Sequence, residues 1–219
     1  MSSPVKIILT GATGMVGEGV MHECLLSDAV TQVLIINRRP TGFEHPKLKE
    51  IIHENFNDLT SILDQLAGYD ACLFCAGVSS IGKKEAEYSE LTYTLTLNFA
   101  KAVSKNPSMI FCYISGAGTD ANGRMMWARV KGKTENDLKK LPFKKVYNFR
   151  PGILYPTKGL KNTLSAYKYF GWLIPLIKLL TPNSGTTLAE LGKAMINAVT
   201  KGYDTQTIEV KDIKILAKE

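Results

Sequence analysis

The stretch that most constrains the fold is TGATGMVGEG, residues 10–19, because it places three glycines between two segments of different character. The preceding run, VKIILT, predicts a buried strand, and the apolar side of Met15–Leu26 predicts a helix. Gly11, Gly14 and Gly17 follow a G-x-x-G-x-x-G spacing, one residue longer than the usual G-x-G-x-x-G fingerprint. Such glycines turn the chain, admit a phosphate and let helix and strand pack closely. The turn therefore predicts a dinucleotide at a helix N-terminus.

Strand and helix patterns continue to alternate along the chain. Short apolar runs predict strands at 31–37, 47–54, 70–77, 108–118 and 144–155, with helices between them at 59–68, 85–105 and 124–140. Helices of this length between strands imply right-handed crossovers and a parallel sheet that is covered on both faces. The sequence therefore predicts an α/β fold with a doubly wound parallel sheet.

The composition changes after Tyr155. Residues 156–184 are rich in Pro, Gly and aromatic side chains, and they predict a small lobe that caps the carboxyl edge of the sheet. Binding of a membrane surface or of a second copy by the apolar segment 170–180 is the alternative. A helix at 186–202 and a candidate edge strand at 207–211 follow. We therefore expect a nucleotide-binding core at 1–155, a capping lobe at 156–184, and a C-terminal helix and edge strand at 185–219 that complete the same domain.

The net charge of +7 arises from 27 Lys and Arg against 20 Asp and Glu, and the basic residues are scattered along the chain. A dispersed excess is typical of solvated faces with one anion site, so no nucleic-acid partner is expected. The N-terminal apolar run lacks the pattern of a cleaved signal peptide, and residues 170–180 are too few to span a membrane. We therefore expect an intracellular, cytoplasmic protein without a transmembrane span.

The cysteines and histidines give no metal pattern. Cys72 and Cys75 form a C-x-x-C, but they fall in a strand-like run, where residues three apart face opposite sides of the sheet. This favours four reduced cysteines that fill the core over a redox pair. The three histidines have no metal-ligand spacing, so no metal site is expected.

The end of the second predicted strand bears on the choice of cofactor. An acidic residue there would bind the adenosine ribose and select NAD, but the sequence has INRRP, with Arg38 and Arg39 after Asn37. Guanidinium groups pair with phosphate in a bidentate manner. The two arginines therefore favour NADP(H) over NAD(H), and solvated surface arginines are the alternative.

Several motifs in this order resemble a known superfamily. They are GATGMVG at the turn, NRRP after the second strand, CAG after the fourth, ISGAG after the fifth, a helix bearing Lys131, and RPGILYP after the sixth. Together they resemble the short-chain dehydrogenase/reductase superfamily, in its atypical, extended-like branch. That branch includes the Tat-interacting-protein type of oxidoreductase and is related to the NAD-dependent epimerases and dehydratases. The resemblance implies a Rossmann fold with strand order 3-2-1-4-5-6.

The resemblance also assigns cofactor contacts by position. One position departs from the family, because Asn55 stands where an acid near adenine is expected. The implied contacts are Gly11, Thr13, Gly14, Met15 and Val16 for the pyrophosphate, Arg38 and Arg39 for the 2′-phosphate, Asn55 and Phe56 near adenine, Cys75, Ala76 and Gly77 along the ribose, and Pro151, Gly152 and Ile153 beside the nicotinamide.

The family's catalytic residues are a serine, a tyrosine and a lysine, with the last two on one helix face. Ser115 matches the serine and Lys131 matches the lysine, which would also hold the nicotinamide ribose. The tyrosine position is Trp127, whose indole N–H can donate a hydrogen bond but cannot shuttle a proton near neutral pH. No Tyr or His lies between Tyr113 and Tyr147. Trp127 is therefore either part of a substrate pocket or a packing residue.

Three functions remain open from the sequence. The first is an NADP(H)-dependent oxidoreductase for a small carbonyl or hydroxyl substrate, with a proton from water, Lys131, or a tyrosine such as Tyr88 or Tyr155. The second is a catalytically weak NADPH-binding redox sensor or regulatory protein with a protein partner. The third is an epimerase or dehydratase. The substrate stays unassigned, and either a monomer or a homodimer is expected.

Overall fold

The computed structural model describes residues 4–157, 159–162 and 184–219. Its central feature is a seven-stranded sheet in which all neighbouring strands are parallel, in the order β3-β2-β1-β4-β5-β6-β9. This order confirms the predicted doubly wound fold, with β9 as an edge strand. The strands are β1 (Val5–Thr10), β2 (Val30–Asn37), β3 (Leu48–Ile52), β4 (Ala71–Phe74), β5 (Ile110–Ile114), β6 (Lys145–Arg150) and β9 (Thr207–Glu209).

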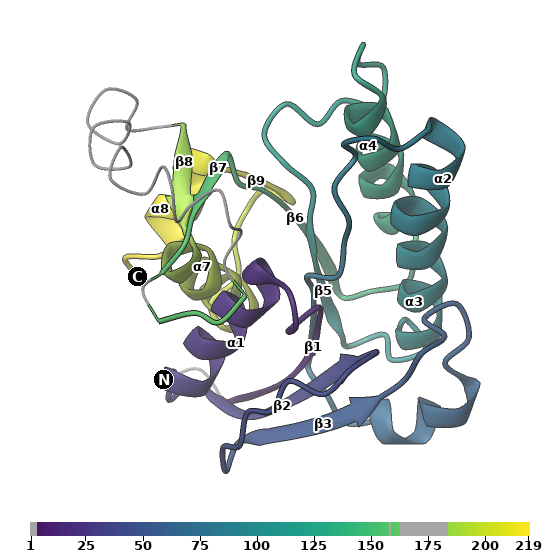
Figure 1. Ribbon diagram of the computed structural model, residues 1–219. Helices are drawn as coiled ribbons and strands as arrows, with labels where there is room; N and C mark the ends of the chain where they lie inside the picture. The colour runs from purple at the N-terminus through teal and green to yellow at the C-terminus, as the bar shows by residue number, and fades with distance from the viewer. Residues whose placement is uncertain (1–3, 158, 163–183) are drawn as a thin grey trace.

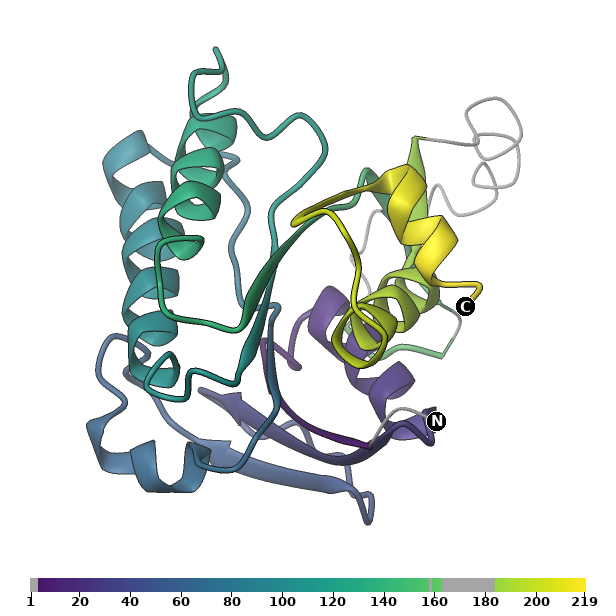
Figure 2. The ribbon, with the colours of Figure 1, turned by 180° about the vertical axis from the view of Figure 1, so that it is seen from behind.

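Helices cover both faces of this sheet, as Figure 1 and the reverse view in Figure 2 show. One face carries α1 (Met15–Leu26), α7 (Leu188–Thr200) and α8 (Val210–Leu216). The other face carries α2 (Glu85–Ser89), α3 (Leu95–Val103) and α4 (Met126–Leu138), with a short 3₁₀ helix, η1 (Thr60–Leu66), at its border. Each face buries its own hydrophobic cluster, as expected where a parallel sheet is covered on both sides.

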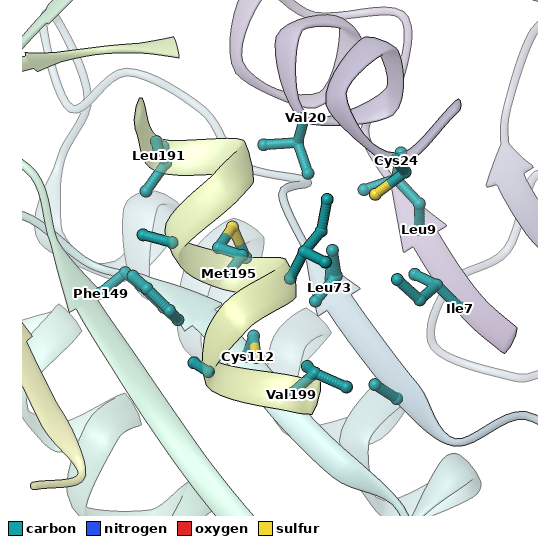
Figure 3. Close-up of a cluster of buried hydrophobic side chains, with 14 of the residues drawn as sticks. Ile7, Leu9, Val20, Cys24, Leu73, Cys112, Phe149, Leu191, Met195 and Val199 are labelled. Carbon is teal, nitrogen blue, oxygen red and sulfur yellow. The ribbon is translucent and has the colours of Figure 1, made fainter. Parts of the chain in front are cut away.

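Helix α7 packs across the middle of the sheet (Figure 3). Its side chains Leu191 and Met195 are fully buried, and Phe149 of β6 is buried beside them. Gly19 of α1 lies directly against α7, since a Cβ at that position would stand 2.7 Å from the Cβ of Leu188. This close approach fixes α1, and with it the glycine-rich turn, against the rest of the molecule.

Two predicted elements are divided in the structure. The predicted helix 85–105 consists of α2, a π-helical turn η2 (Glu90–Thr94) and α3. The predicted strand 144–155 breaks at Pro151, which has no N–H to donate to a ladder. After the break, β7 (Ile153–Tyr155) leaves the large sheet and pairs in parallel with β8 (Gly185–Thr187). The chain thus changes sheets beside the carboxyl edge of β6.

Most of the predicted capping lobe 156–184, including the apolar segment 170–180, lies outside the described residues. Helix α8 follows β9 without having been predicted, and it begins at a capping box formed by Glu209 and Asp212. In the described ranges, no helix is both long and apolar enough to cross a membrane.

Candidate functional site

The turn between β1 and α1 requires glycine for steric reasons. Gly11 has a φ of 75°, and a Cβ there would lie 2.7 Å from backbone atoms of Cys75 and Ala76. At Gly17 a Cβ would lie 2.1 Å from the Gly11 oxygen. Helix α1 begins at Met15, and its N-cap Gly14 has no side chain to cap it, so the first N–H groups of the helix have no intrahelical partner.

Asn37 at the end of β2 holds this turn in place. Its side chain is 2% exposed, and its Oδ1 accepts a hydrogen bond from the Ala12 N–H at 3.2 Å. Its Nδ2 donates to Glu50 Oε1 at 3.4 Å. The position that usually carries an acid for the adenosine ribose is therefore occupied by an amide that supports the turn itself.

A cavity of about 840 Å³ opens beside the turn, at the carboxyl ends of β1, β4 and β5. Parallel α/β sheets bind their ligands at this edge. The structure brings most of the predicted site residues together there. Those that line the cavity are Gly11, Thr13, Gly14, Met15, Val16, Arg38, Asn55, Phe56, Cys75, Ala76, Gly77, Ser115, Lys131, Pro151 and Gly152.

Arg39, Trp127 and Ile153 are the predicted site residues that are not among the described residues lining the cavity. Arg38 and Arg39 are both exposed, and Arg38 alone of the two borders the cavity. Ile153 is 46% exposed. Arg38 and Arg39 are adjacent in the sequence but differ in their access to the cavity.

The cavity fits a dinucleotide. A Cβ at Gly11 or Gly17 would collide with neighbouring backbone, so only glycine lets the turn pack this closely beside the space that a pyrophosphate would occupy. The first turn of α1, at Met15, Val16 and Gly17, also lines the cavity and carries N–H groups suited to an anion. The charged side chains among the described lining residues are Arg38, Glu54 and Lys131.

Lys131 on α4 reaches the carboxyl end of β5. Its Nζ donates to the carbonyl oxygens of Ile114 at 3.3 Å and Ser115 at 2.5 Å. Burial lowers the pKa of Lys131 from 10.5 to about 8, and the nearby Glu135 carboxylate opposes that change. Lys131 is therefore mostly protonated at neutral pH, and it loses its proton at a pH only slightly above neutral.

Ser115 lines the cavity, but its hydroxyl has other partners. Its Oγ lies 2.5 Å from Glu135 Oε1 and 3.1 Å from the Phe149 carbonyl oxygen, both of which are acceptors. A hydroxyl has a single proton to donate. In this arrangement the proton goes to one of these two groups, and the hydroxyl can only accept a bond from a substrate.

The Trp127 indole packs on the turn that follows β5. A Cβ at Gly116 or Gly118 would stand 3.8 Å from its ring. No tyrosine or histidine is among the described residues that line the cavity. Tyr88 and Tyr155, the tyrosines considered above, are both buried and do not line it. Lys131 is thus the described group in the cavity with both a proton and a pKa suited to donating it.

The four cysteines are free, as expected from the sequence. Cys24, Cys72 and Cys112 are buried, and Cys75 is half-buried at the wall of the cavity. Burial raises the pKa of each thiol, for Cys24 to about 12, so these side chains are neutral at physiological pH. They act as apolar packing groups, and Cys75 is the one that a bound cofactor could contact.

Several groups of the site were not predicted. Leu91 and Leu95 line the cavity from the π-helical turn and the start of α3. Nothing in the local sequence indicated that these two leucines differ from the other apolar residues of the helix. Glu135 had a visible signal, because an acid four residues after Lys131 lies on the same helix face. Asn37 precedes the two arginines in the sequence, and that position alone does not indicate that it supports the turn.

Comparison with curated proteins gives relatives that align over most of this chain. The chain is 26% identical over 224 residues to "Protein FMP52, mitochondrial" of Candida albicans, which covers 97% of this chain and 94% of that protein. It is 24% identical over 172 residues to "Protein HTATIP2" of Rattus norvegicus, covering 77% of this chain and 71% of the relative.

These names contradict the prediction of a cytoplasmic protein. The fungal relatives from Candida albicans, Emericella nidulans and Scheffersomyces stipitis are all named mitochondrial, which points to mitochondria instead. The prediction rested on the lack of a secretory signal pattern. That pattern reports only on export, because import into an organelle depends on different features of a chain.

Solved structures and a family model agree on the fold. A short-chain dehydrogenase/reductase family oxidoreductase from Burkholderia thailandensis superposes with a TM-score of 0.70 at 15% identity, over 94% of this chain and 90% of that one. MoeE5, solved with UDP-glucuronic acid and NAD, gives a TM-score of 0.64 at 17% identity, over 92% and 74%. The model of the NAD dependent epimerase/dehydratase family matches residues 7–127, more than half of the chain. This chain is therefore a member of the NAD dependent epimerase/dehydratase family.

Proposed function

We propose that the protein is an NADP(H)-dependent oxidoreductase that acts on a small carbonyl or hydroxyl substrate, with Lys131 as the proton donor. The observation that carries this proposal is the position of Lys131. Its ammonium lies at the wall of the cavity, bonded to the Ile114 and Ser115 carbonyls, and its pKa is about 8. A proton donor works best when its pKa lies near the working pH.

The residues of the turn support binding of a phosphate-rich cofactor. Backbone N–H groups at the start of α1 would hold the pyrophosphate, and Asn37 keeps that turn against β2. Arg38 is exposed at the edge of the same cavity and has the planar, bidentate geometry that suits a 2′-phosphate. This favours NADP(H) over NAD(H). Arg39 lies outside the lining and has a smaller role.

The chain's own groups would then divide the work of a reduction. A bound nicotinamide supplies or accepts a hydride. Lys131 gives a proton to the carbonyl oxygen of the substrate, and the two carbonyls that hold its Nζ keep the ammonium in one position. Leu91, Leu95 and Val78 add apolar wall to the cavity and reduce the access of water.

A redox sensor with weak catalysis is the second candidate. It is favoured by Ser115, whose only proton is donated to Glu135 or Phe149 and cannot orient a substrate oxygen. An epimerase or dehydratase is supported less, because such chemistry needs a strong base in the position that Trp127 occupies. The two experiments below separate these functions.

The first experiment measures cofactor preference by isothermal titration with NADPH and NADH. We expect tighter binding of NADPH. Arg38→Ala should raise the Kd for NADPH by about ten- to a hundredfold, because a charge-assisted bond to phosphate is lost, and leave that for NADH nearly unchanged. Arg39→Ala is the matched control and should have the smaller effect. Equal affinity of the parent protein for both cofactors would refute the NADP(H) assignment.

The second experiment measures turnover on a panel of small aldehydes and ketones by oxidation of NADPH. Lys131→Arg keeps the positive charge but cannot release a proton, so the rate should fall by about 10²- to 10⁴-fold. The control is Lys133→Arg, an exposed lysine on the same helix. In the parent protein the rate should decline as the pH rises through about 8, since the ammonium is lost there. NADPH binding without turnover on any compound would favour the sensor.

A further inference from the structure

Glu135 lies on α4 one turn after Lys131 and is 2% exposed. A buried carboxylate needs partners for its charge. Arg150 of β6 donates from Nε to Oε1 at 2.9 Å and from Nη2 to Oε2 at 2.6 Å. The Ser115 hydroxyl donates to Oε1 at 2.5 Å. Glu135 thus connects α4 with the carboxyl ends of β5 and β6.

The same end of β5 holds the Lys131 ammonium. Ser115 is bonded on two sides, because its side chain binds Glu135 and its carbonyl oxygen accepts the shorter of the two Lys131 bonds. A shift of Ser115 would therefore move the acceptor of that bond. The backbone at this point is also paired with β6, through the bond from the Ser115 N–H to the Phe149 carbonyl at 2.8 Å.

We propose that Glu135 is a positioning residue for Lys131: by binding the Ser115 hydroxyl it fixes the carbonyl that receives the ammonium, and its negative charge keeps the lysine protonated. This inference rests on the proposed function, because it concerns the group to which that function assigns the proton. Glu135 does not line the cavity and would act on a substrate only through Lys131.

The other ionisable groups that interact with Glu135 support this assignment. Tyr113 of β5 is buried, and burial raises its pKa, so the phenol stays neutral. Arg150 of β6 is paired with Glu135 and, through Nη1 at 3.1 Å, with Glu209 of β9. Within the described residues, Glu135 is therefore the acid whose charge raises the pKa of Lys131, against the lowering caused by burial.

The test is a pH titration of Lys131 in the protein without substrate. The titration is monitored by NMR, with lysine labelled with ¹³C at the ε carbon. The Lys131 signal is assigned by its loss in Lys131→Met. The parent signal should titrate near pH 8. In Glu135→Gln, which keeps the size and an acceptor but removes the charge, the midpoint should fall by about one pH unit. Glu209→Gln makes the same chemical change at the other, half-exposed partner of Arg150 and should leave the midpoint unchanged.

A double variant covers the outcome in which Glu135→Gln does not fold because Arg150 is left with one partner. Glu135→Gln with Arg150→Met removes both charges, and the midpoint should still fall, since Glu135 is the partner that acts on Lys131. An unchanged midpoint in either folded variant, or an equal fall in Glu209→Gln, would overturn the proposal. Lack of carbonyl reduction by the parent protein would instead count against the proposed function and leave this titration interpretable.

Discussion

Among single residues, Lys131 carries a clear electrostatic cost for the fold. Its pKa is about 8 in the folded protein against an ordinary value of 10.5, because burial disfavours the ammonium. Between these two pH values the unfolded chain binds a proton that the folded chain has released. Stability contributed by this group therefore rises with pH across the window and is lost as the pH falls through about 8. Such a cost is typical of functional sites.

This linkage can be measured with Lys131→Met, which lacks the titrating group. We expect the free energy of unfolding of the parent, minus that of the variant, to increase by up to about 3 kcal/mol between pH 8 and pH 10.5. Urea unfolding, monitored by circular dichroism at several pH values, gives this difference in free energy. The contributions of the other titrating groups cancel in the difference. A difference that stays constant with pH would mean that the lysine is not buried as described.

At the level of elements, the contact between α1 and α7 positions the glycine-rich turn. Gly19 faces the Leu188 side chain, and a Cβ at Gly192 would lie 2.7 Å from the Cβ and Cγ of Glu23. The distance between packed helices depends on the side chains at the contact, so a glycine there lets the two helices pack more closely. The glycines in these helices therefore lower the helix propensity but allow close packing between α1 and α7.

Gly19→Ala tests which of these two effects is larger. Because alanine has a higher helix propensity than glycine, this substitution would stabilise an exposed helix by about 1 kcal/mol. Here the new Cβ would lie 2.7 Å from the Leu188 Cβ, so we expect a net loss of about 1–3 kcal/mol from overpacking. Gly77→Ala is the control, because a Cβ there meets nothing within 4 Å. Both are measured by chemical denaturation, and a gain in stability for Gly19→Ala would show that α1 and α7 can separate without cost.

In the whole molecule, the C-terminal segment closes the sheet on its β6 side. Ile208 of β9 and Ile213 and Leu216 of α8 are fully buried, and they belong to the cluster beneath α1 and α7. Arg150 adds a bond from β6 to Glu209. The last strand and helix therefore belong to the same hydrophobic core as the glycine-rich turn.

Removal of residues 207–219 should abolish cooperative unfolding, because it exposes this core to water. The readout is a thermal melt followed by near-ultraviolet circular dichroism. Removal of Lys218 and Glu219 alone, which are exposed, is the control and should shift the melting temperature only slightly. A cooperative melt in the longer truncation would indicate that the rest of the chain folds by itself.

The sequence by itself determined the parallel sheet, the strand–turn–helix unit and the edge of the sheet at which the cavity opens. These depend on local periodicity and on glycines whose conformation is set within the turn, as at Gly11 with its positive φ. The family motifs added Lys131 and most of the residues that line the cavity.

The tertiary structure alone decided which way the side chains of those segments face. It placed Arg38, but not Arg39, at the cavity. It also directed the Ser115 hydroxyl to Glu135 and led the chain into a second sheet after Pro151. It also brought Leu91 and Leu95 to the cavity through a π-helical turn. The reason is physical: strand and helix patterns depend on neighbours in sequence, whereas the partner of a buried polar group is set by packing between elements distant in the chain.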